Sequence, residues 1–351
     1  MWHCERKLLI QLLVLSIGVM RCKDRSPSVA GLSSVKHRPA SSASQVARGQ
    51  YLVEIAQCLD CHSPLDDSLD PQPLPDLLGA GDVLNEETGL VAPNITPDAE
   101  TGAGTWTDDQ LSRAVREGIG HDGRRLSLQM PWNHYSVLTD ADVYAVAAYL
   151  RGLKPVRHKL PASTSRLEED AVKPVAPAQE RDLNTPPLRG AYLVRLARCI
   201  YCHSPRATDG VNTDLAKAFS GGRRFVHRKN WYVDIVPDPP VRASDPPDPN
   251  TSNDLVTSPN LTSHASGLKH YDSDMFIRTI RSGKVNGVRP LTGAMPWAYF
   301  RHMSDEDLRA IFAYLQEVPP VNHYVSNSER ASYCKVCKRW HGGGEFNRAA
   351  P

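Results

Sequence analysis

The chain has 351 residues, enough for two domains of ordinary size, and 40% of them are apolar, which excludes a wholly disordered protein. Lys and Arg (41) nearly balance Asp and Glu (39), so no excess of basic charge points to nucleic acid as a partner. The 28 prolines imply long irregular connections and argue against a coiled coil or a helical repeat array.

The N-terminus has the pattern of a secretion signal. Arg6 and Lys7 precede the uncharged stretch 8–20, which is shorter than the roughly 20 residues that cross a bilayer. We expect residues 1–30 to be a cleaved signal peptide or an uncleaved anchor. Lipidation of Cys22 is a third alternative, although the preceding Arg21 fits it poorly. The sequence therefore predicts a periplasmic or otherwise extracytoplasmic protein, soluble or tethered at its N-terminus.

An internal repeat organises the rest of the chain. RGQYLV at 48–53 recurs as RGAYLV at 189–194, and CLDCHSP at 58–64 recurs as CIYCHSP at 199–205, both at an offset of 141. MPW at 130–132 returns at 295–297, an offset of 165. Because the order of these landmarks is kept, we expect two copies of one domain.

We place the first domain at 45–158, a linker rich in Pro and charge at 159–187, the second domain at 188–320 and a tail at 321–351. Between Cys202 and Pro259 the second copy carries about 25 extra residues, including six prolines, which we expect to form a surface loop.

Within each copy the sequence predicts helices. Apolar spacing favours a helix over 47–56, and the capping-box pattern Thr107 to Gln110 opens one that stops at Gly118. Thr139 and Ser304 precede the final helices of the two copies. No segment alternates over a sustained length, so strands are minor and the predicted fold class is all-α.

Each copy contains Cys-x-x-Cys-His, the attachment sequence of c-type haem. The two thiols, one helical turn apart, each bond a vinyl group of the macrocycle, and the imidazole of the following His becomes an axial iron ligand. The motifs predict two covalently attached haems c, held by Cys58, Cys61 and His62 and by Cys199, Cys202 and His203. The alternatives are a redox dithiol, which needs no following His, and half of a zinc site, which needs further ligands nearby.

The sixth iron ligands are predicted to be Met130 and Met295. Each stands in Met-Pro-Trp between two helices, and the proline favours an extended loop there. A thioether suits reduced iron and raises the reduction potential. The rivals, His121 or His134 in the first copy and His302 or Met303 in the second, have no counterparts in both copies. Trp132 and Trp297 are expected to cover the haem edge, or simply to pack in the core.

Both halves resemble class I cytochrome c domains, in particular those of the multi-haem cytochrome c subunits of membrane-bound alcohol and gluconate dehydrogenases. The resemblance covers roughly 48–151 and 189–316. It is carried by the haem and Met-Pro-Trp motifs, by RGxYL at 48–52, by PNITPD at 93–98 and GxGxWT at 102–107, and by their partners in the second copy. The resemblance implies two tandem class I cytochrome c domains, each wrapped around one haem.

A third Cys pair lies in the tail, where Cys334 and Cys337 are followed by Lys338 in place of His. We favour a disulfide there, as expected in an oxidising compartment. A zinc site with His341 lacks one ligand of a closed set, and haem attachment is disfavoured because too few residues follow to enclose a macrocycle.

Two filled axial positions leave no open iron site for a substrate, which favours an electron carrier. Its donor is expected to be a periplasmic dehydrogenase or a quinol-linked complex, and its acceptor an oxidase or another cytochrome. The alternatives are a haem enzyme, such as a di-haem peroxidase or a thiosulfate-dehydrogenase-like oxidoreductase, and a relay subunit of a dehydrogenase complex. The sequence leaves open whether the chain is itself an enzyme.

Overall fold

The computed structural model describes residues 41–66, 72–164, 173–208, 212–228, 231–234, 255–325, 332–333, 335–336 and 340–341. The predictions for residues 1–30 and for Cys334 and Cys337 lie outside them. Within the described ranges, no helix has the length and apolar character needed to cross a membrane. Everything described below belongs to one compact unit, Ser41–Pro351.

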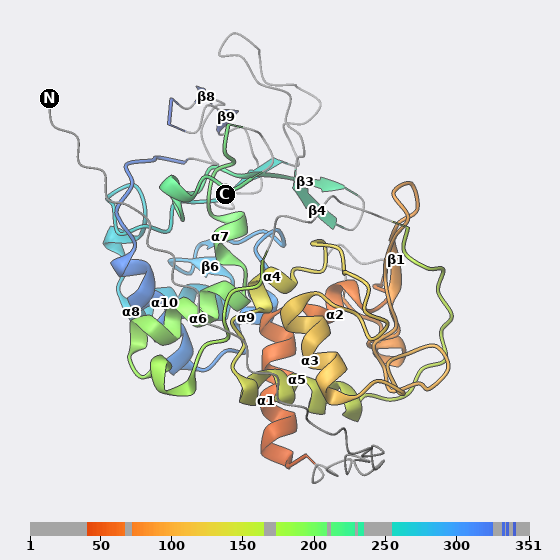
Figure 1. The fold of residues 1–351 in the computed structure, drawn as a ribbon. Helices are drawn as coiled ribbons and strands as arrows, with labels where there is room; N and C mark the ends of the chain where they lie inside the picture. The colour runs from red at the N-terminus through yellow and green to blue at the C-terminus, as the bar shows by residue number, and fades with distance from the viewer. Residues whose placement is uncertain are drawn as a thin grey trace, which may run out of the picture. The chain divides into compact units, whose positions relative to one another are not determined.

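The first copy is built from short helices and one small hairpin (Figure 1). In chain order its elements are α1 (Ala43–Ile55), α2 (Cys58–Cys61), η1 (Pro75–Leu77), β1 (Asp82–Asn85), β2 (Leu90–Ala92), α3 (Asp108–Glu117), α4 (Trp132–Tyr135) and α5 (Asp140–Gly152).

The second copy repeats this order of helices. After η2 (Glu180–Leu183) in the linker, its elements are α6 (Pro186–Leu196), α7 (Cys199–Cys202), η3 (Leu215–Lys217), β3 (Arg224–Arg228), β4 (Trp231–Asp234), β5 (Leu255–Thr257), η5 (Leu268–His270), α8 (Ser273–Ser282), β6 (Lys284–Val285), β7 (Arg289–Pro290), α9 (Trp297–Phe300) and α10 (Asp305–Glu317). The tail contains β8 (Ser332–Tyr333) and β9 (Trp340–His341).

The helix boundaries follow from capping residues. Thr107 and Gln110 form the expected capping box, with both reciprocal bonds present, and α3 ends at Gly118 with φ 65°. The expected helix over 47–56 begins earlier, because the Ser42 side chain accepts a hydrogen bond from the amide of Gln45. The predicted starts after Thr139 and Ser304 are confirmed.

The extra segment of the second copy is not a loop throughout. β3 pairs with both β4 and β5 in a three-stranded antiparallel sheet, and all six prolines expected to shape the loop lie outside the described residues. The prediction missed these strands because it weighed the prolines and not the β-branched and aromatic residues on either side of them.

In each copy, the helix before the haem motif crosses the final helix at close range. α1 packs against α5, and α6 packs against α10. A Cβ atom on Gly49 would overlap the backbone carbonyl of Ala145, and one on Gly190 would overlap that of Ala310. Glycine is repeated at this position because it has no Cβ atom, which lets the two helix backbones approach this closely.

The hydrophobic core is shared between the copies. One cluster of buried side chains contains apolar residues from α1, α5, α6, α8 and α10, including Leu52, Ile55, Val143, Val146, Leu193, Leu196, Ile277, Leu308 and Leu315. The two halves of the repeat therefore pack against each other through apolar surface.

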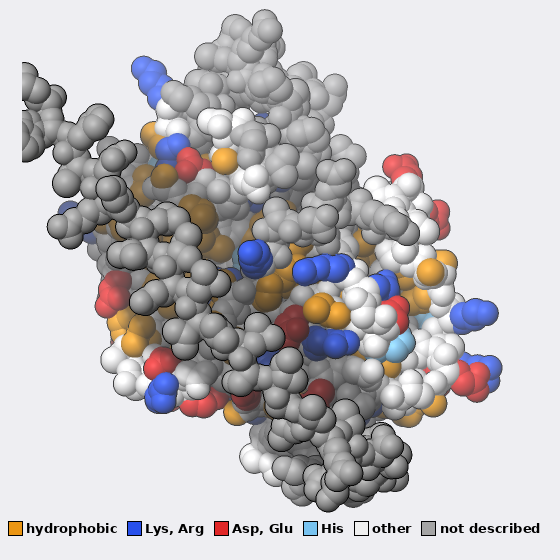
Figure 2. All heavy atoms as spheres, in the orientation of Figure 1, with side chains coloured by type: hydrophobic (Ala, Val, Ile, Leu, Met, Phe, Trp, Pro, Cys, Tyr) orange, Lys and Arg blue, Asp and Glu red, His pale blue; other side chains and the backbone are white. Residues whose placement is uncertain are grey.

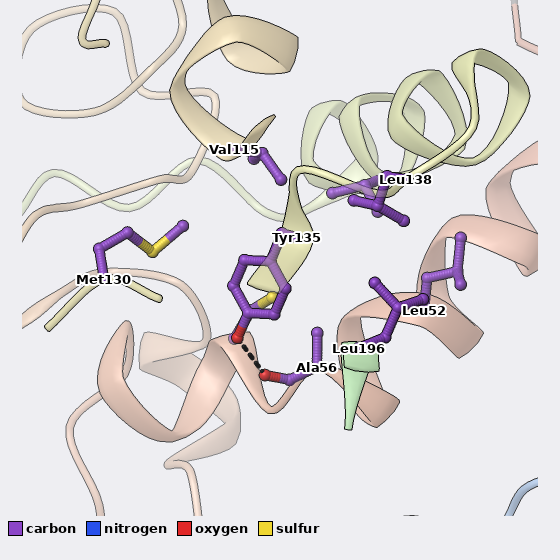
Figure 3. Close-up of a pocket in the computed structure, with 9 residues that line it drawn as sticks. Leu52, Ala56, Val115, Met130, Tyr135, Leu138 and Leu196 are labelled. Carbon is purple, nitrogen blue, oxygen red and sulfur yellow. Dashed lines mark hydrogen bonds between the residues drawn. The ribbon is translucent and has the colours of Figure 1, made fainter. Parts of the chain in front are cut away.

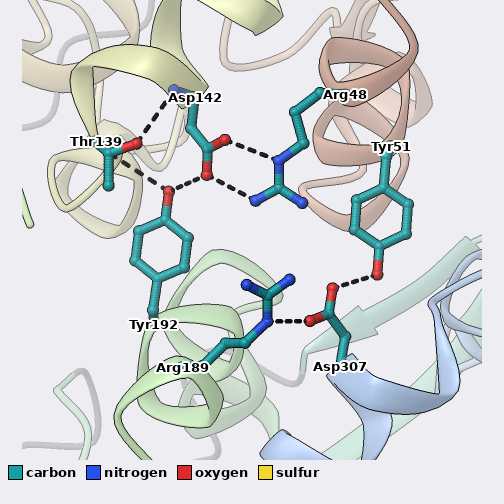
Figure 4. Close-up of polar contacts among 7 residues, drawn as sticks. All are labelled: Arg48, Tyr51, Thr139, Asp142, Arg189, Tyr192 and Asp307. Atoms are coloured by element: carbon teal, nitrogen blue, oxygen red, sulfur yellow. Dashed lines mark hydrogen bonds and ion pairs between the residues drawn. The ribbon is translucent and has the colours of Figure 1, made fainter. Parts of the chain in front are cut away.

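Polar contacts between the copies are reciprocal (Figure 4). Arg48 of α1 binds the Asp142 carboxylate at the start of α5 through two bonds of 2.8 Å, and Tyr192 of α6 donates to the same carboxylate at 2.6 Å. In the second copy, Arg189 pairs with Asp307.

Tyr51 of the first copy donates to Asp307 at 2.6 Å and so completes the reciprocal set (Figure 4). We call these six residues the Arg-Asp-Tyr clasp: Arg48, Asp142, Tyr192, Arg189, Asp307 and Tyr51. Each copy supplies an Arg-Asp pair and the tyrosine that binds the other copy's pair, so the contact is isologous, as in a two-fold symmetric dimer.

Candidate functional site

The first Cys-x-x-Cys forms a single helical turn directly after α1. Gln57 has φ 55° and turns the chain between α1 and α2. Cys58 and Cys61 at the two ends of α2 are free, partly buried thiols. Burial raises the pKa of Cys58 to about 12 and raises that of Cys61, so both sulfurs are protonated at neutral pH.

The second motif repeats this geometry. Arg198 has φ 56° and turns the chain from α6 into α7, whose ends are Cys199 and Cys202. Burial raises the pKa of Cys199 to about 12. In both copies, therefore, two sulfurs lie one turn apart behind a left-handed residue.

The histidine that follows each pair is held in one tautomer. The Nδ1 atom of His62 lies 2.8 Å from the carbonyl oxygen of Pro93, and that of His203 lies 2.9 Å from the carbonyl oxygen of Pro259. Because a carbonyl only accepts, Nδ1 carries the proton and Nε2 keeps its lone pair. Burial lowers the pKa of both rings and keeps them neutral, the state that ligates iron.

The prolines are positioned by the asparagine that follows each of them. The Asn94 side chain accepts hydrogen bonds from the Thr96 amide and hydroxyl and donates to the carbonyl of Val156, beyond α5. Asn260 binds Thr262 in the same way. The motif Pro-Asn-x-Thr recurs after the haem motif in both copies, and this recurrence, at different distances from the histidine, was the available signal for its role.

Met130 lines an apolar pocket in the first copy (Figure 3). About 310 Å³ of space between its walls is free of protein atoms, part of it open solvent, and the walls are Leu52, Ala56, Cys58, Val115, Met130, Tyr135, Leu138, Val146 and Leu196. One wall residue, Leu196, comes from the second copy. Figure 3 shows Met130 and Leu196 on opposite sides of Tyr135, whose hydroxyl donates to the Ala56 carbonyl.

The two Met-Pro-Trp turns have the same backbone geometry. The Trp132 amide donates to the Met130 carbonyl at 2.7 Å, and the Trp297 amide donates to the Met295 carbonyl at 2.7 Å. Both methionines pack against the shared core as partly buried side chains. The structure therefore presents Met295 in the same kind of turn as Met130.

The rival ligands have other surroundings. His121 stacks on Trp106 with ring centroids 4.4 Å apart, and Met303 is buried in the core. Burial lowers the pKa of His134 to about 4, and His302 is exposed. Among the described residues, no group of three or more His, Cys, Asp or Glu side chains is arranged to hold a metal ion.

Trp132 and Trp297 both pack against the glycine that ends a helix. A Cβ atom on Gly118 would lie 2.5 Å from the Trp132 ring, and one on Gly283 would lie 2.5 Å from the Trp297 ring. Trp132 is fully buried and donates its indole hydrogen to the carbonyl of Leu126. This packing gives each tryptophan a structural role in fixing the methionine turn.

The donor set fits a covalently attached haem. A neutral imidazole with an available Nε2, two neutral thiols one turn apart and a thioether are what a His/Met haem c requires. In the first copy, Cys58 and Met130 face the same pocket, whose walls are otherwise almost entirely apolar. Such walls would suit a planar apolar macrocycle.

Comparison with known proteins agrees with this chemistry. Residues 46–154 match the family model described as cytochrome c. The chain is 26% identical over 302 residues to the cytochrome c subunit of a quinone alcohol dehydrogenase from Gluconobacter oxydans, covering 81% of this chain and 57% of the relative.

Two further relatives are similar in sequence over most of this chain. The fructose dehydrogenase cytochrome subunit of Gluconobacter japonicus is 28% identical, over 88% of this chain and 57% of its own length. A diheme cytochrome c-type protein of Cereibacter sphaeroides is 28% identical, over 80% of this chain and 88% of its own length. The chain thus spans little more than half the length of the alcohol and fructose dehydrogenase subunits.

Proposed function

We propose that this chain, which contains a cytochrome c domain and resembles the cytochrome c subunits of dehydrogenases, is a di-haem electron-transfer protein. A cytochrome c domain implies covalently bound haem c, whose iron accepts and releases one electron at a time. The count of two haems is the proposal. The observation that carries it is the repetition of the whole arrangement, from the left-handed residue to the His–Pro carbonyl bond, in both copies.

The residues have distinct tasks in this proposal. Cys58 and Cys61 attach the first haem, His62 and Met130 are its axial ligands, and the Pro93 carbonyl orients the imidazole. Cys199 and Cys202 attach the second haem.

His203 and Met295 are the axial ligands of the second haem, and the Pro259 carbonyl orients its imidazole. With each haem held by a histidine and a methionine of the protein, the residues around it would rearrange little on one-electron transfer, which would favour fast transfer.

The two domains are proposed to occupy 45–158 and 188–320, joined through 159–187. The clasp and the shared core support a fixed arrangement of the two sites within one unit. We further propose that the protein acts outside the cytoplasm, directed there by residues 1–30, since c-type haem motifs accompany a signal-like N-terminus.

The partners are proposed to be redox proteins. The relatives include cytochrome subunits of an alcohol and a fructose dehydrogenase, which favours a dehydrogenase as donor. An oxidase or another cytochrome is the acceptor expected for such a relay. One face of the molecule mixes basic, acidic and apolar side chains (Figure 2), as the net charge of +2 suggests, and so favours modest transient contacts over strong electrostatic steering.

A redox titration followed by visible absorbance tests the proposal. We expect two one-electron transitions, with the weak red band of Met-ligated ferric haem arising from both copies, and no binding of azide or peroxide to the ferric protein. A haem that binds azide, or that lacks the Met band, would have an open or exchangeable site. That result would favour the catalytic alternative of a di-haem peroxidase or a related oxidoreductase.

A further inference from the structure

The two haem-attachment loops touch each other at equivalent positions. Gln57 and Arg198 both directly precede the first cysteine of a motif and both have positive φ. The Arg198 guanidinium donates to the Gln57 side-chain oxygen at 3.1 Å. The reciprocal contact between copies thus brings together the turns that position α2 and α7, but with a neutral residue in one copy and a cation in the other.

Arg198 lies close to the sulfur atoms of both motifs. Burial raises the pKa of Cys58, Cys61 and Cys199, and in each case the positive charge of Arg198 opposes that rise. The Arg198 guanidinium also interacts electrostatically with Tyr135 and Cys202. One arginine therefore places its charge within electrostatic range of both attachment sites.

No carboxylate forms an ion pair with Arg198 in the part of the chain that the structure describes. Gln57 is uncharged, and the Arg198 Nε atom is buried without a hydrogen-bond partner among the described residues. Asp60 is the nearby opposing charge, and its influence on Cys58 and Cys61 is smaller than that of Arg198. A net positive field therefore remains between the two sites.

We propose that Arg198 is a shared electrostatic positioning residue, which raises the reduction potential of both haems and holds the two attachment loops together through Gln57. The inference rests on the proposed function. Ferric haem carries one more positive charge than ferrous haem, so a fixed cation beside it favours the reduced state. A partly buried guanidinium acts strongly because the local dielectric is low, and it stays protonated at all working pH values.

The test is a potentiometric titration of the haem-loaded protein, comparing wild type with Arg198→Gln, Arg198→Lys and Arg195→Gln. Arg195 is the matched control, because it is an arginine of α6 that bonds the Asn133 carbonyl across the same interface and is not among the charges acting on the cysteine sulfurs. Arg198→Gln is expected to lower the reduced-to-oxidised ratio of both haems about tenfold at a fixed ambient potential. For a one-electron couple this equals 59 mV.

The charge-preserving variant Arg198→Lys is expected to keep both potentials near those of wild type, as is Arg195→Gln. The double variant Gln57→Arg with Arg198→Gln moves the cation to the equivalent position and is expected to restore both potentials. Thermal unfolding and haem content of each variant verify that it is folded and loaded.

Three results would overturn the inference: unchanged potentials in Arg198→Gln, an equal fall in Arg198→Lys, or an equal fall in Arg195→Gln. A wild-type protein without covalent haem would instead overturn the proposed function, and this inference with it, before any variant is made.

Discussion

The two copies share the geometry that we propose for haem binding and differ in the charges that surround it. The His–Pro carbonyl bond, the methionine turn and the Gly-mediated helix crossing are the same in both. The left-handed residue before the motif is neutral Gln57 in the first copy and cationic Arg198 in the second. The elements proposed to hold the haem are therefore the same in the two copies, whereas the charges that would tune its reduction potential differ.

A second difference lies on the histidine side. The amides of Gly81 and Gly221 donate to the carbonyls of His62 and His203, so these glycines are equivalent. Two residues later the first copy has Val83, and the second has the buried Arg223, which donates to the Ser204 carbonyl and to Thr213. Arg223 thus braces the chain directly after His203. We expect the two haems to have different potentials as a consequence.

The largest expected effect is the loss of one haem when the cysteine pair of one copy is replaced. Replacing Cys58 and Cys61 by Ala removes both attachment points of the first haem, while Cys199 and Cys202 still hold the second. Pyridine haemochrome analysis should find half of the wild-type haem content, and the converse double variant should give the same value. Loss of both haems from one double variant would mean that the copies do not load independently.

Replacing one of the proposed methionine ligands should change the reduction potential of one haem without removing it. Met130→Ala is expected to keep its haem attached through the two thioethers but to lower the potential of that haem, because the soft methionine ligand that favours reduced iron is lost. Met295→Ala should do the same for the other haem alone. Spectroelectrochemistry of the two variants checks this, with wild type as control. An unchanged potential in either variant would show that another residue ligates that iron.

Removing either carboxylate of the Arg-Asp-Tyr clasp should destabilise the protein by the same amount. Asp142→Asn and Asp307→Asn each leave an arginine and a tyrosine without their carboxylate, and we expect each to lower the free energy of unfolding by about 2 kcal/mol. Denaturant unfolding measures this. Asp140→Asn is the control, since Asp140 is exposed and pairs with Arg116. A loss limited to one of the two clasp variants would contradict the reciprocal interface.

Substitutions at the helix crossings are expected to destabilise the protein by a similar amount. Gly49→Ala and Gly190→Ala force α1 from α5 and α6 from α10, and we expect each to lower the free energy of unfolding by about 1–3 kcal/mol. Gly152→Ala is the control, because nothing lies within 4 Å of a Cβ atom there. Equal stability of Gly49→Ala and Gly152→Ala in thermal unfolding would exclude the close crossing.

The smallest expected effect is a pH dependence. Burial and the bond to Asp307 raise the pKa of Tyr51 from 10.0 to about 12, and burial also raises that of Tyr192. A raised pKa means that the folded state holds the proton more tightly. Stability should therefore be full below pH 10 and fall as the pH rises towards 12.

Tyr51→Phe should lose about 1 kcal/mol at neutral pH and show a shallower decline in alkali. Unfolding curves at several alkaline pH values compare the two proteins. A decline as steep in Tyr51→Phe as in wild type would assign the effect to other groups.

The sequence predicted what depends on local pattern or on motif. The repeat, the helix starts at Thr107, Thr139 and Ser304, and the predominance of helix could all be inferred from spacing and capping chemistry. The strands β3 to β5 were missed because the prolines of the segment were weighed more than its β-branched and aromatic residues, and because β5 pairs with β3 across a long intervening segment. The iron ligands themselves stay a prediction.

The sequence analysis also missed the contacts made by backbone carbonyls and between copies. The Pro93 carbonyl has no signature in its own side chain, and its bond to His62 depends on how the loop folds back. The clasp and the Gln57–Arg198 contact depend on which surfaces of the two copies meet. The repeat predicted two similar domains but carried no information about the interface between them.

The most direct measurement of the central claim is intact and peptide mass spectrometry of the purified protein. The account predicts a mass that exceeds the polypeptide by two haems, with one haem on the peptide containing Cys58 and Cys61 and one on the peptide containing Cys199 and Cys202. Free thiols on either peptide, or haem removed by acidified acetone, would contradict it.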